Sequence, residues 1–131
     1  MKEFKEIFGK ARILVAEDDP TNQILSEKCL TLYGCQAQNI TIVENGKLVI
    51  QQLTENINNY FKLILMDGSM PELGGIETTK IIRNTLGMTI PIIALTADDN
   101  KEECINSGMN AYHQKPVDII GLRKVLLDWL E

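Results

Sequence analysis

Short apolar runs alternate with amphipathic segments along almost the whole chain, and this alternation constrains the fold more than any other feature of the sequence. A strand, a helix and a second strand in succession are typical of βαβ units, which build parallel sheets. The runs that we predict as strands are Ile13–Ala16, Asn39–Val43, Leu63–Met66, Ile90–Leu95 and Ala111–Gln114. Right-handed crossovers place the helices between them on both faces of the sheet. The pattern therefore predicts a doubly wound α/β fold with five parallel strands and five helices.

Two of these strands differ in a way that predicts their places in the sheet. Leu63–Met66 is continuously apolar, as expected of a strand at the centre. In Asn39–Val43 apolar and polar residues alternate, which is typical of a half-exposed edge strand.

Capping residues mark the expected helix boundaries. Asp19 can cap the first helix, and Pro20 fits its first position, where a missing N–H costs nothing. Asp99 and Glu102 have capping-box spacing for the fourth helix. The spacing predicts an apolar face of Leu25, Cys29 and Leu32 on the first helix, and of Ile76, Thr79 and Ile82 on the third.

The composition is that of one compact domain in a reducing compartment. A chain of 131 residues suits a single core, and 5% aromatic residues indicate an aliphatic one. The net charge of -5 disfavours nucleic-acid binding, and no apolar stretch has the roughly 20 residues that span a bilayer. The 3 cysteines lack C-x-x-C spacing, so we expect neither disulfides nor zinc. Residues 1–10 are expected to be a linker or an extra helical turn before a domain at 11–131.

Side chains suited to chemistry follow the ends of four predicted strands. Glu17 and Asp18 follow the first strand, and Asp67 follows the central one. Thr96 follows the fourth strand and Lys115 the fifth. Because ligands of open α/β sheets bind at the carboxyl ends of the strands, we expect these side chains to meet at one edge.

This set of side chains suits magnesium and phosphoryl chemistry. Crowded carboxylates favour a divalent cation, and Mg²⁺ prefers oxygen ligands. We expect Asp18 and Asp67 to bind Mg²⁺ directly with a backbone carbonyl from the following loop, and Glu17 to hold a metal-bound water. A carboxylate can then attack a phosphoryl group whose charge Mg²⁺ and Lys115 neutralise, while Thr96 hydrogen-bonds to a phosphoryl oxygen.

Four motifs, in this order, resemble the receiver domain of two-component response regulators. They are Ile13–Pro20 (ILVAEDDP), Leu65–Pro71 (LMDGSMP), Ala94–Ala97 (ALTA) and Lys115–Pro116. The resemblance extends from about residue 11 to the last residue, and it is greatest to receivers of hybrid histidine kinases of the fungal osmosensor type. It implies a flavodoxin-like receiver fold with the strand order 2-1-3-4-5.

The resemblance also implies roles for individual residues. Asp67 would accept a phosphoryl group from a phosphohistidine. Mg²⁺ would be bound by Asp18, Asp67 and the Ser69 carbonyl, with Glu17 assisting through water. Lys115 would contact the phosphoryl group.

A conformational switch and a partner follow from the same resemblance. Thr96 would move toward the phosphoryl group and let Tyr112 turn inward. The Lys115–Pro116 peptide bond is commonly cis in the family. The expected partner is a histidine-containing phosphotransfer protein or a histidine kinase, which would dock on the first helix and the loops around Asp67 and Lys115. We expect a cytoplasmic monomer or weak dimer, or the cytosolic part of a membrane-bound hybrid kinase, without nucleic-acid or direct membrane contact. The domain would catalyse its own phosphorylation and its slow dephosphorylation.

Gly74 departs from the usual family pattern, and Asp98 lies at a position that varies within the family. Receivers often carry Asp where this chain has Gly74, so we expect a more flexible loop and a lost cap on the third helix. Asp98 lies two residues beyond Thr96, and we hypothesise that its charge changes the lifetime of the aspartyl phosphate. An unchanged dephosphorylation rate in Asp98→Asn would contradict this hypothesis.

Simpler interpretations exist for each residue taken alone. An Asp after an apolar run is most often a turn residue, and Asp19 is better explained as a helix cap than as a metal ligand. Tyr112 as an ordinary edge-strand aromatic is the alternative to its role in the switch. We expect His113 to be a surface residue of the fifth strand rather than a phosphorylation site.

Three other functional classes share parts of the pattern. A haloacid-dehalogenase-type phosphohydrolase needs a second Asp two residues after the nucleophile, where this chain has Ser69. A flavodoxin needs a Ser/Thr-rich phosphate loop after the first strand, where this chain has acids. A pseudo-receiver, which binds partners without being phosphorylated, is disfavoured by the complete set of acids, threonine and lysine.

Overall fold

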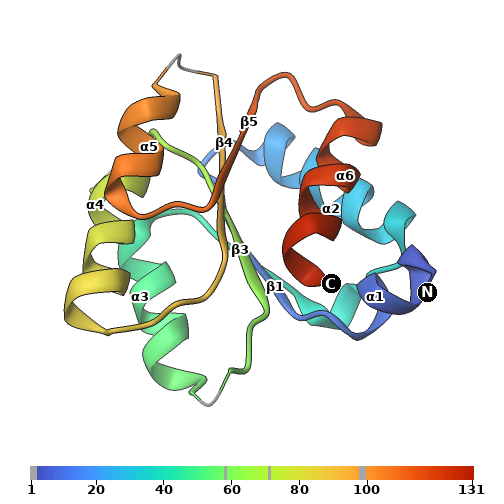
Figure 1. Cartoon of the computed structure of the whole chain (residues 1–131), viewed down its shortest axis with the longest axis horizontal. Coiled ribbons are helices and arrows are strands. Elements are labelled where there is room, and N and C mark those ends of the chain that lie inside the picture. Colours follow the sequence, from blue (N-terminus) through green and yellow to red (C-terminus); the bar gives the residue numbers. More distant parts are fainter. Residues whose placement is uncertain (1–2, 58, 71, 98–99) are drawn as a thin grey trace.

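A five-stranded parallel sheet in the order β2-β1-β3-β4-β5 forms the centre of the computed structural model (Figure 1). The structure describes residues 3–57, 59–70, 72–97 and 100–131. The strands are β1 (Ile13–Ala16), β2 (Ile40–Val43), β3 (Leu63–Met66), β4 (Ile92–Thr96) and β5 (Ala111–Gln114). The predicted fold class, the strand order and the edge position of β2 are confirmed. The fourth strand begins at Ile92 rather than Ile90, and Pro91 has no N–H with which to extend the ladder.

Six α-helices cover the sheet in the described part of the chain. They are α1 (Phe4–Lys10), α2 (Pro20–Tyr33), α3 (Gly46–Glu55), α4 (Gly75–Lys80), α5 (Lys101–Ser107) and α6 (Ile119–Leu130). A 3₁₀ turn (Ala37–Asn39) precedes β2, and a π-helical segment (Ile81–Thr85) continues α4. None of these helices is long and apolar enough to cross a membrane.

The helices divide between the two faces of the sheet, as Figure 1 shows. Helices α1, α2 and α6 lie on one face, and α3, α4 and α5 lie on the other. Alternate residues of each inner strand enter different cores, so Ile13 and Val15 pack toward the first set of helices while Leu14 and Ala16 pack toward the second. Strands β1, β3 and β4 are buried along their whole length, and all their residues are apolar except Thr96 at the end of β4.

Helix α1 is the helix that the strand–helix alternation did not predict. Its Phe8 is fully buried and lies against the ring of Tyr33, with 5.1 Å between the ring centroids. The guanidinium of Arg123 lies 4.7 Å from the centre of the Phe4 ring. These contacts place residues 4–10 on the same core as α2 and α6.

The predicted apolar face of α2 is wrong in part. The buried residues are Ser26, Cys29, Leu30 and Tyr33. In contrast, Leu25 is 37% exposed and Leu32 is 63% exposed. Apolar residues occur on two sides of this helix, so the spacing alone does not select the buried side. Contacts with other elements select it, including a hydrogen bond from the Tyr33 hydroxyl to the Ile119 carbonyl.

The helix caps agree with the sequence at α2 and show a missing cap at α4. The Asp19 carboxylate accepts a hydrogen bond from the Thr21 N–H, 3.0 Å away. At the start of α4, Gly74 makes no side-chain cap, as expected from the absence of Asp there. The predicted cap at Asp99 and the hypothesis about Asp98 concern residues outside the described ranges.

Candidate functional site

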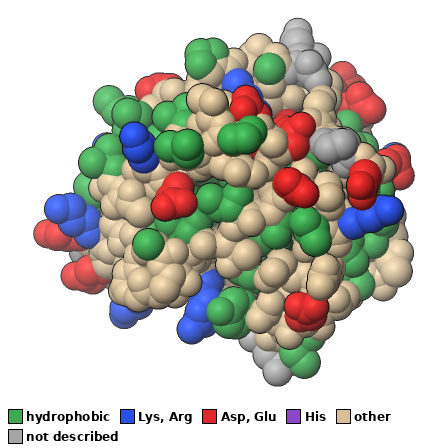
Figure 2. All heavy atoms as spheres, turned by 180° about the vertical axis from the view of Figure 1, so that it is seen from behind, with side chains coloured by type: hydrophobic (Ala, Val, Ile, Leu, Met, Phe, Trp, Pro, Cys, Tyr) green, Lys and Arg blue, Asp and Glu red, His purple; other side chains and the backbone are tan. Residues whose placement is uncertain are grey.

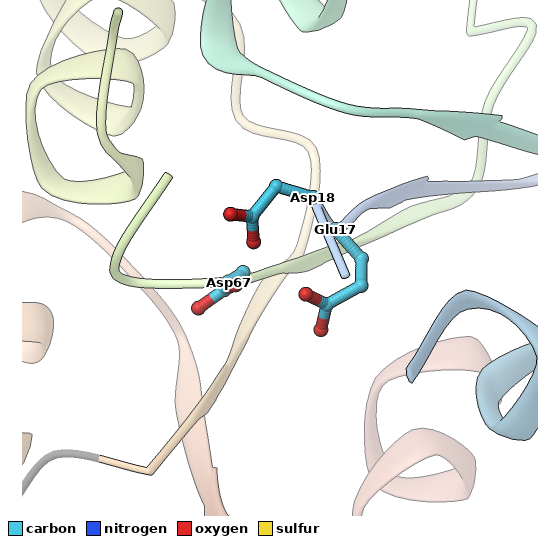
Figure 3. A group of neighbouring side chains, drawn as sticks. All are labelled: Glu17, Asp18 and Asp67. Atoms are coloured by element: carbon cyan, nitrogen blue, oxygen red, sulfur yellow. The ribbon is translucent and has the colours of Figure 1, made fainter. Parts of the chain in front are cut away.

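The acidic residues after β1 and β3 are brought together by the register of the two strands. Ala16 pairs with Met66, so the residues that follow them leave the sheet side by side. The Asp67 N–H donates to the Ala16 carbonyl over 3.0 Å, which extends the pairing by one step. Figure 3 shows Glu17 and Asp18 on one strand end and Asp67 on the other, with their carboxylates gathered around a common space. One carboxylate oxygen from each lies within 4.8 Å of the others.

The three carboxylates differ in their exposure to water. Glu17 and Asp67 are buried, with 1% and 6% of their surface exposed, whereas Asp18 is exposed. The Glu17 carboxylate accepts a hydrogen bond from the Asp19 N–H at 3.2 Å. The Asp67 carboxylate accepts one from the Ser69 N–H at 3.0 Å. The cluster is therefore a buried pair of acids, Glu17 and Asp67, with the exposed Asp18 at its rim.

Lys115 supplies a positive charge to this pair of acids. Its Nζ lies 2.7 Å from Glu17 Oε1 and 3.6 Å from Asp67 Oδ2. The end of β5 holds it there, because the Lys115 N–H donates to the Thr96 carbonyl over 2.8 Å. The peptide bond to Pro116 is cis, as the resemblance implied. The lysine therefore makes its shorter contact with Glu17 rather than with the central aspartate.

Thr96 and Tyr112 lie on the two strands beyond Asp67. Thr96 is buried at the end of β4, and a Cβ added to Gly68 would lie 3.3 Å from its hydroxyl. The threonine is thus next to the residue that follows Asp67. Tyr112 pairs with Ala94 and is half-buried against the core under α3, α4 and α5.

Glu17 and Asp67 share the positive charge of Lys115. Burial raises the pKa of Asp67 to about 7, and the neighbouring Glu17 adds to the increase, while the Ser69 N–H and Lys115 oppose it. Burial alone would lower the pKa of Lys115, but its contacts with Glu17 and Asp67 outweigh burial and raise it. The Asp67 shift follows mainly from burial, and the Lys115 shift follows from its contacts with two acids. A further cation at this point would relieve the repulsion.

The donor set fits Mg²⁺ by its chemistry. Three carboxylates within 4.8 Å of one another supply hard oxygen ligands, and the exposed Asp18 leaves access for water. Of the residues predicted for the site, Glu17, Asp18, Asp67 and Lys115 are brought together. Thr96 lies beside the same loop.

Two other polar residues complete the description of this edge. Gln23, which the sequence reasoning missed, donates its side-chain amide to the Glu17 carbonyl over 2.7 Å. No motif distinguishes this glutamine from a solvent-facing one, because the contact depends on the path of the chain after β1. His113 is half-buried on β5, and its Nε2 accepts a hydrogen bond from the Asp118 N–H. Burial lowers the pKa of His113, and the nearby Asp118 opposes this.

Comparison with known proteins identifies the family. A family model described as the response regulator receiver domain matches residues 13–127. The chain belongs to this family. The match covers all five strands, the helices α2 to α5 and α6 as far as Leu127, and it leaves α1 outside.

Similar proteins include sensor kinases and isolated receivers. The osmosensing histidine protein kinase SLN1 of Saccharomyces cerevisiae is 39% identical over 124 residues, which cover 90% of this chain and 10% of that protein. The magnesium-bound receiver domain of the sensor histidine kinase PA1611 from Pseudomonas aeruginosa PAO1 is 35% identical, with a TM-score of 0.77. That match covers 90% of this chain and 95% of the other.

A third similar structure contains a phosphotransfer partner. It is the co-crystal structure of the Saccharomyces cerevisiae histidine phosphotransfer protein Ypd1 with the receiver domain of its downstream response regulator Ssk1. The match has 28% identity and a TM-score of 0.80, and it covers 92% of this chain and 88% of the other.

These relatives establish the kind of domain. The chain spans only a small part of the curated relatives that it matches. It covers 10% of SLN1 and 7% of the hybrid signal transduction protein dokA of Dictyostelium discoideum. The chain is a receiver domain of the two-component and phosphorelay type, and it is similar in sequence to receivers of hybrid histidine kinases. Its acidic cluster fits a magnesium-binding phosphoacceptor site.

Proposed function

We propose that Asp67 is the phosphoacceptor of this receiver domain. The observation that carries the proposal is the position of its carboxylate, which lies at the end of the central strand within reach of both the other acids and Lys115. An anionic nucleophile needs cationic neighbours to approach a phosphoryl group. At Asp67 these neighbours would be Lys115 and an Mg²⁺ ion held by the acids.

Mg²⁺ would be held by Asp18, Asp67 and the carbonyl of Ser69, and Glu17 would assist through a water molecule. The ion would supply the charge that neutralises the phosphoryl oxygens. The Ser69 N–H already holds the Asp67 carboxylate by a 3.0 Å hydrogen bond, which orients that carboxylate before a phosphoryl group arrives.

The proposed reaction is a phosphoryl transfer between two side chains. A carboxylate oxygen of Asp67 attacks the phosphorus of a phosphohistidine, the new O–P bond forms, and the N–P bond to the imidazole breaks. The imidazole nitrogen leaves with the bonding electron pair and takes up a proton from solvent. Lys115 turns from Glu17 toward the phosphoryl group, and the Thr96 hydroxyl donates to one of its oxygens.

Phosphorylation would then change the surface near β4 and β5. Thr96 would move toward the phosphoryl group, and Tyr112 would turn into the space that this movement leaves. The half-buried position of Tyr112 beside the α3–α5 core supports this proposal, because the ring has both an exposed and a buried side.

A partner of the histidine phosphotransfer class or a histidine kinase would dock beside the acidic cluster. Two apolar side chains in the first half of α2, Ile24 and Leu25, are 58% and 37% exposed. At the start of α6, Ile119 and Ile120 are 46% and 68% exposed. Both helix starts follow loops of the carboxyl edge, so an apolar partner surface placed there would bring its histidine toward Asp67.

The wider setting follows from the relatives. We propose that the domain acts on the cytosolic side as part of a hybrid kinase, as a monomer or weak dimer, and without contact with nucleic acid. Figure 2 shows a face on which acidic, basic and apolar side chains are interspersed, which suits transient protein contacts better than a polyanion.

Phosphorylation with a small donor tests the proposed function. We expect incubation with Mg²⁺ and acetyl phosphate to form one base-labile, acid-stable adduct, detected as a mass increase of a single phosphoryl group. Asp67→Asn should abolish it, and Asp19→Asn, which changes a neighbouring cap, should keep it. Absence of both the adduct and Mg²⁺ binding would instead support a pseudo-receiver. Turnover of simple phosphate esters would support a phosphohydrolase.

A further inference from the structure

The loop after Asp67 contains a strained residue and leads into a helix without a side-chain cap. It ends at Gly74, which begins α4 without a side-chain cap. Glu72 within it has a backbone φ of 66°, in the left-handed region that is unfavourable for a residue with a Cβ. Such a conformation persists only where surrounding contacts impose it.

The start of α3 supplies such a contact. The Gly46 N–H donates to the Leu73 carbonyl over 3.1 Å, directly after the strained Glu72. The next residue, Lys47, lies 3.7 Å from the Glu72 carboxylate, but both side chains are exposed and this ion pair contributes little. Of these two contacts among the described residues, the backbone hydrogen bond is the stronger link between α3 and the loop.

The same contact leaves no room for a side chain. A Cβ on Gly46 would lie 1.9 Å from the Thr78 hydroxyl and 2.6 Å from the Leu73 carbonyl oxygen. Thr78 is fully buried, and its hydroxyl donates to the Gly74 carbonyl over 2.7 Å. Gly46, Leu73 and Thr78 thus form a three-residue brace between α3, the loop and the first turn of α4.

A second close approach fixes the other end of the loop. A Cβ on Gly75 would lie 2.3 Å from the Asp67 carbonyl oxygen. The backbone of α4 is thus packed directly on the residue that carries the candidate phosphoacceptor. Contacts from Gly46 and Gly75 therefore hold Leu73 and Asp67, which are described residues near the two ends of the loop.

We propose that Gly46 is a positioning residue for the metal site, acting through the brace to set the place of the Ser69 carbonyl and hence the Mg²⁺ affinity. The proposal rests on the proposed function, in which that carbonyl is a ligand. It assigns to a residue of α3, outside the acidic cluster, a part in metal binding. It also explains how the loop is held although Gly74 provides no cap.

Replacement of Gly46 by alanine tests the brace. The added Cβ must push the Leu73 carbonyl aside, and we expect Mg²⁺ affinity measured by calorimetry to fall by about 10-fold to 100-fold, as for other groups that orient metal ligands. Gly9→Ala is the matched control, because a Cβ there meets only the Gly34 carbonyl at an ordinary 3.7 Å. Gly9→Ala should bind Mg²⁺ like the native chain.

A second pair of variants separates positioning from general loss of stability. Ile82→Val removes one methyl group from the same core and lowers stability without touching the loop. Its Mg²⁺ affinity should stay native. Thr78→Val keeps the volume but removes the hydrogen bond to Gly74, and it should weaken Mg²⁺ binding less than Gly46→Ala does.

Rescue by a restored cap gives the most specific readout. At Gly74 a Cβ would meet only the Gly68 carbonyl, at 3.5 Å, so a side chain fits. In Gly74→Asn the side chain can cap α4 without adding charge. We expect Gly46→Ala combined with Gly74→Asn to recover part of the lost Mg²⁺ affinity.

Amide hydrogen exchange makes the outcome independent of the metal. Gly46→Ala should speed exchange at Gly68, Ser69 and Gly75, and Gly9→Ala should not. Mg²⁺ affinity in Gly46→Ala equal to that of Ile82→Val would overturn the positioning role. If the native chain binds no Mg²⁺ at all, the proposed function fails, and the exchange rates alone then show whether the brace holds the loop.

Discussion

Charged side chains lie at least partly buried at both edges of the sheet, but their hydrogen-bond and ion-pair partners differ between the two edges. At the amino edge, Arg83 donates to the carbonyls of Gly108 and Met88 and to the Asn110 side chain, over 2.8 to 3.0 Å. At the carboxyl edge, Glu17 and Asp67 share one lysine. The arginine donates to three neutral acceptors, whereas the two acids lie close together and contact one ammonium group.

The difference teaches how to tell a structural charge from a reactive one. Burial lowers the pKa of Arg83, yet its hydrogen bonds satisfy the guanidinium, so the group ties α4, β4 and β5 together. Asn110 also accepts from the Ile92 N–H, which extends the tie to the start of β4. At the opposite edge, Glu17 and Asp67 are held in place but share the one ammonium group of Lys115. Such a concentration of negative charge favours binding of a cation and, with it, of a phosphoryl group.

The largest expected effect comes from removing the charge of Asp67. Its pKa in the folded protein, about 7, lies above the unfolded value of about 3.9, so the protonated form is favoured by folding. The contribution of protonated Asp67 to the free energy of unfolding is fully present below a pH of about 4, and it is lost as the pH rises toward about 7. We expect Asp67→Asn to be more stable than the native chain by about 2 to 4 kcal/mol at pH 8 without metal. Urea unfolding at pH 4 and pH 8 measures the difference, which should nearly vanish at pH 4 and shrink at pH 8 when Mg²⁺ is added.

Removing the arginine should have the opposite sign. Arg83→Ala removes the hydrogen bonds to the Gly108 and Met88 carbonyls and one of the two that the Asn110 amide oxygen accepts, and we expect a loss of about 2 kcal/mol in unfolding free energy. This loss should be nearly the same at pH 6 and pH 8. Native Mg²⁺ affinity in the folded variant would support the separation of the two edges, and a loss of affinity larger than that of an equally destabilised core variant would contradict it.

Substitution of Lys115 tests how its ammonium group affects Mg²⁺ binding beside Glu17 and Asp67. Lys115→Gln removes the ammonium that contacts Glu17 and Asp67, so Mg²⁺ has less competition, and we expect about threefold to tenfold tighter Mg²⁺ binding by calorimetry. The same variant should form the acetyl-phosphate adduct more slowly, because the phosphoryl charge loses its partner. Tighter binding together with faster phosphorylation would argue against a role for Lys115 at the phosphoryl group.

The smallest effect concerns a buried polar group that belongs to neither edge. Ser26 on α2 is 1% exposed, and its hydroxyl has no hydrogen-bond partner among the residues that the structure describes. Replacement by alanine removes an unsatisfied group, and we expect a gain of about 1 kcal/mol, seen as a higher urea midpoint. Ser107→Ala is the contrasting variant, because that buried hydroxyl donates to the Cys104 carbonyl and its removal should not stabilise.

Much of the fold followed from local patterns, and the exceptions have a common cause. The strand at Leu63–Met66 was predictable because a continuously apolar run bounded by polar residues has few alternatives. The buried side of α2 was not predictable, because Leu25 and Leu32 are as apolar as the residues that are buried. The sequence left open whether residues 1–10 form a linker or a helical turn, because the place of α1 depends on the contact between Phe8 and Tyr33.

The sequence by itself determined that this chain is an open α/β receiver and that Glu17, Asp18, Asp67, Thr96 and Lys115 converge on one edge of its sheet. Hydrophobic periodicity sets the elements, and parallel strands end on the same side, so the convergence needs no knowledge of packing. Only the tertiary structure decided that Lys115 lies closer to Glu17 than to Asp67, that burial raises the pKa of Asp67, and that Gly46 closes on Leu73. These depend on distances between segments far apart in the chain, which local sequence patterns do not encode.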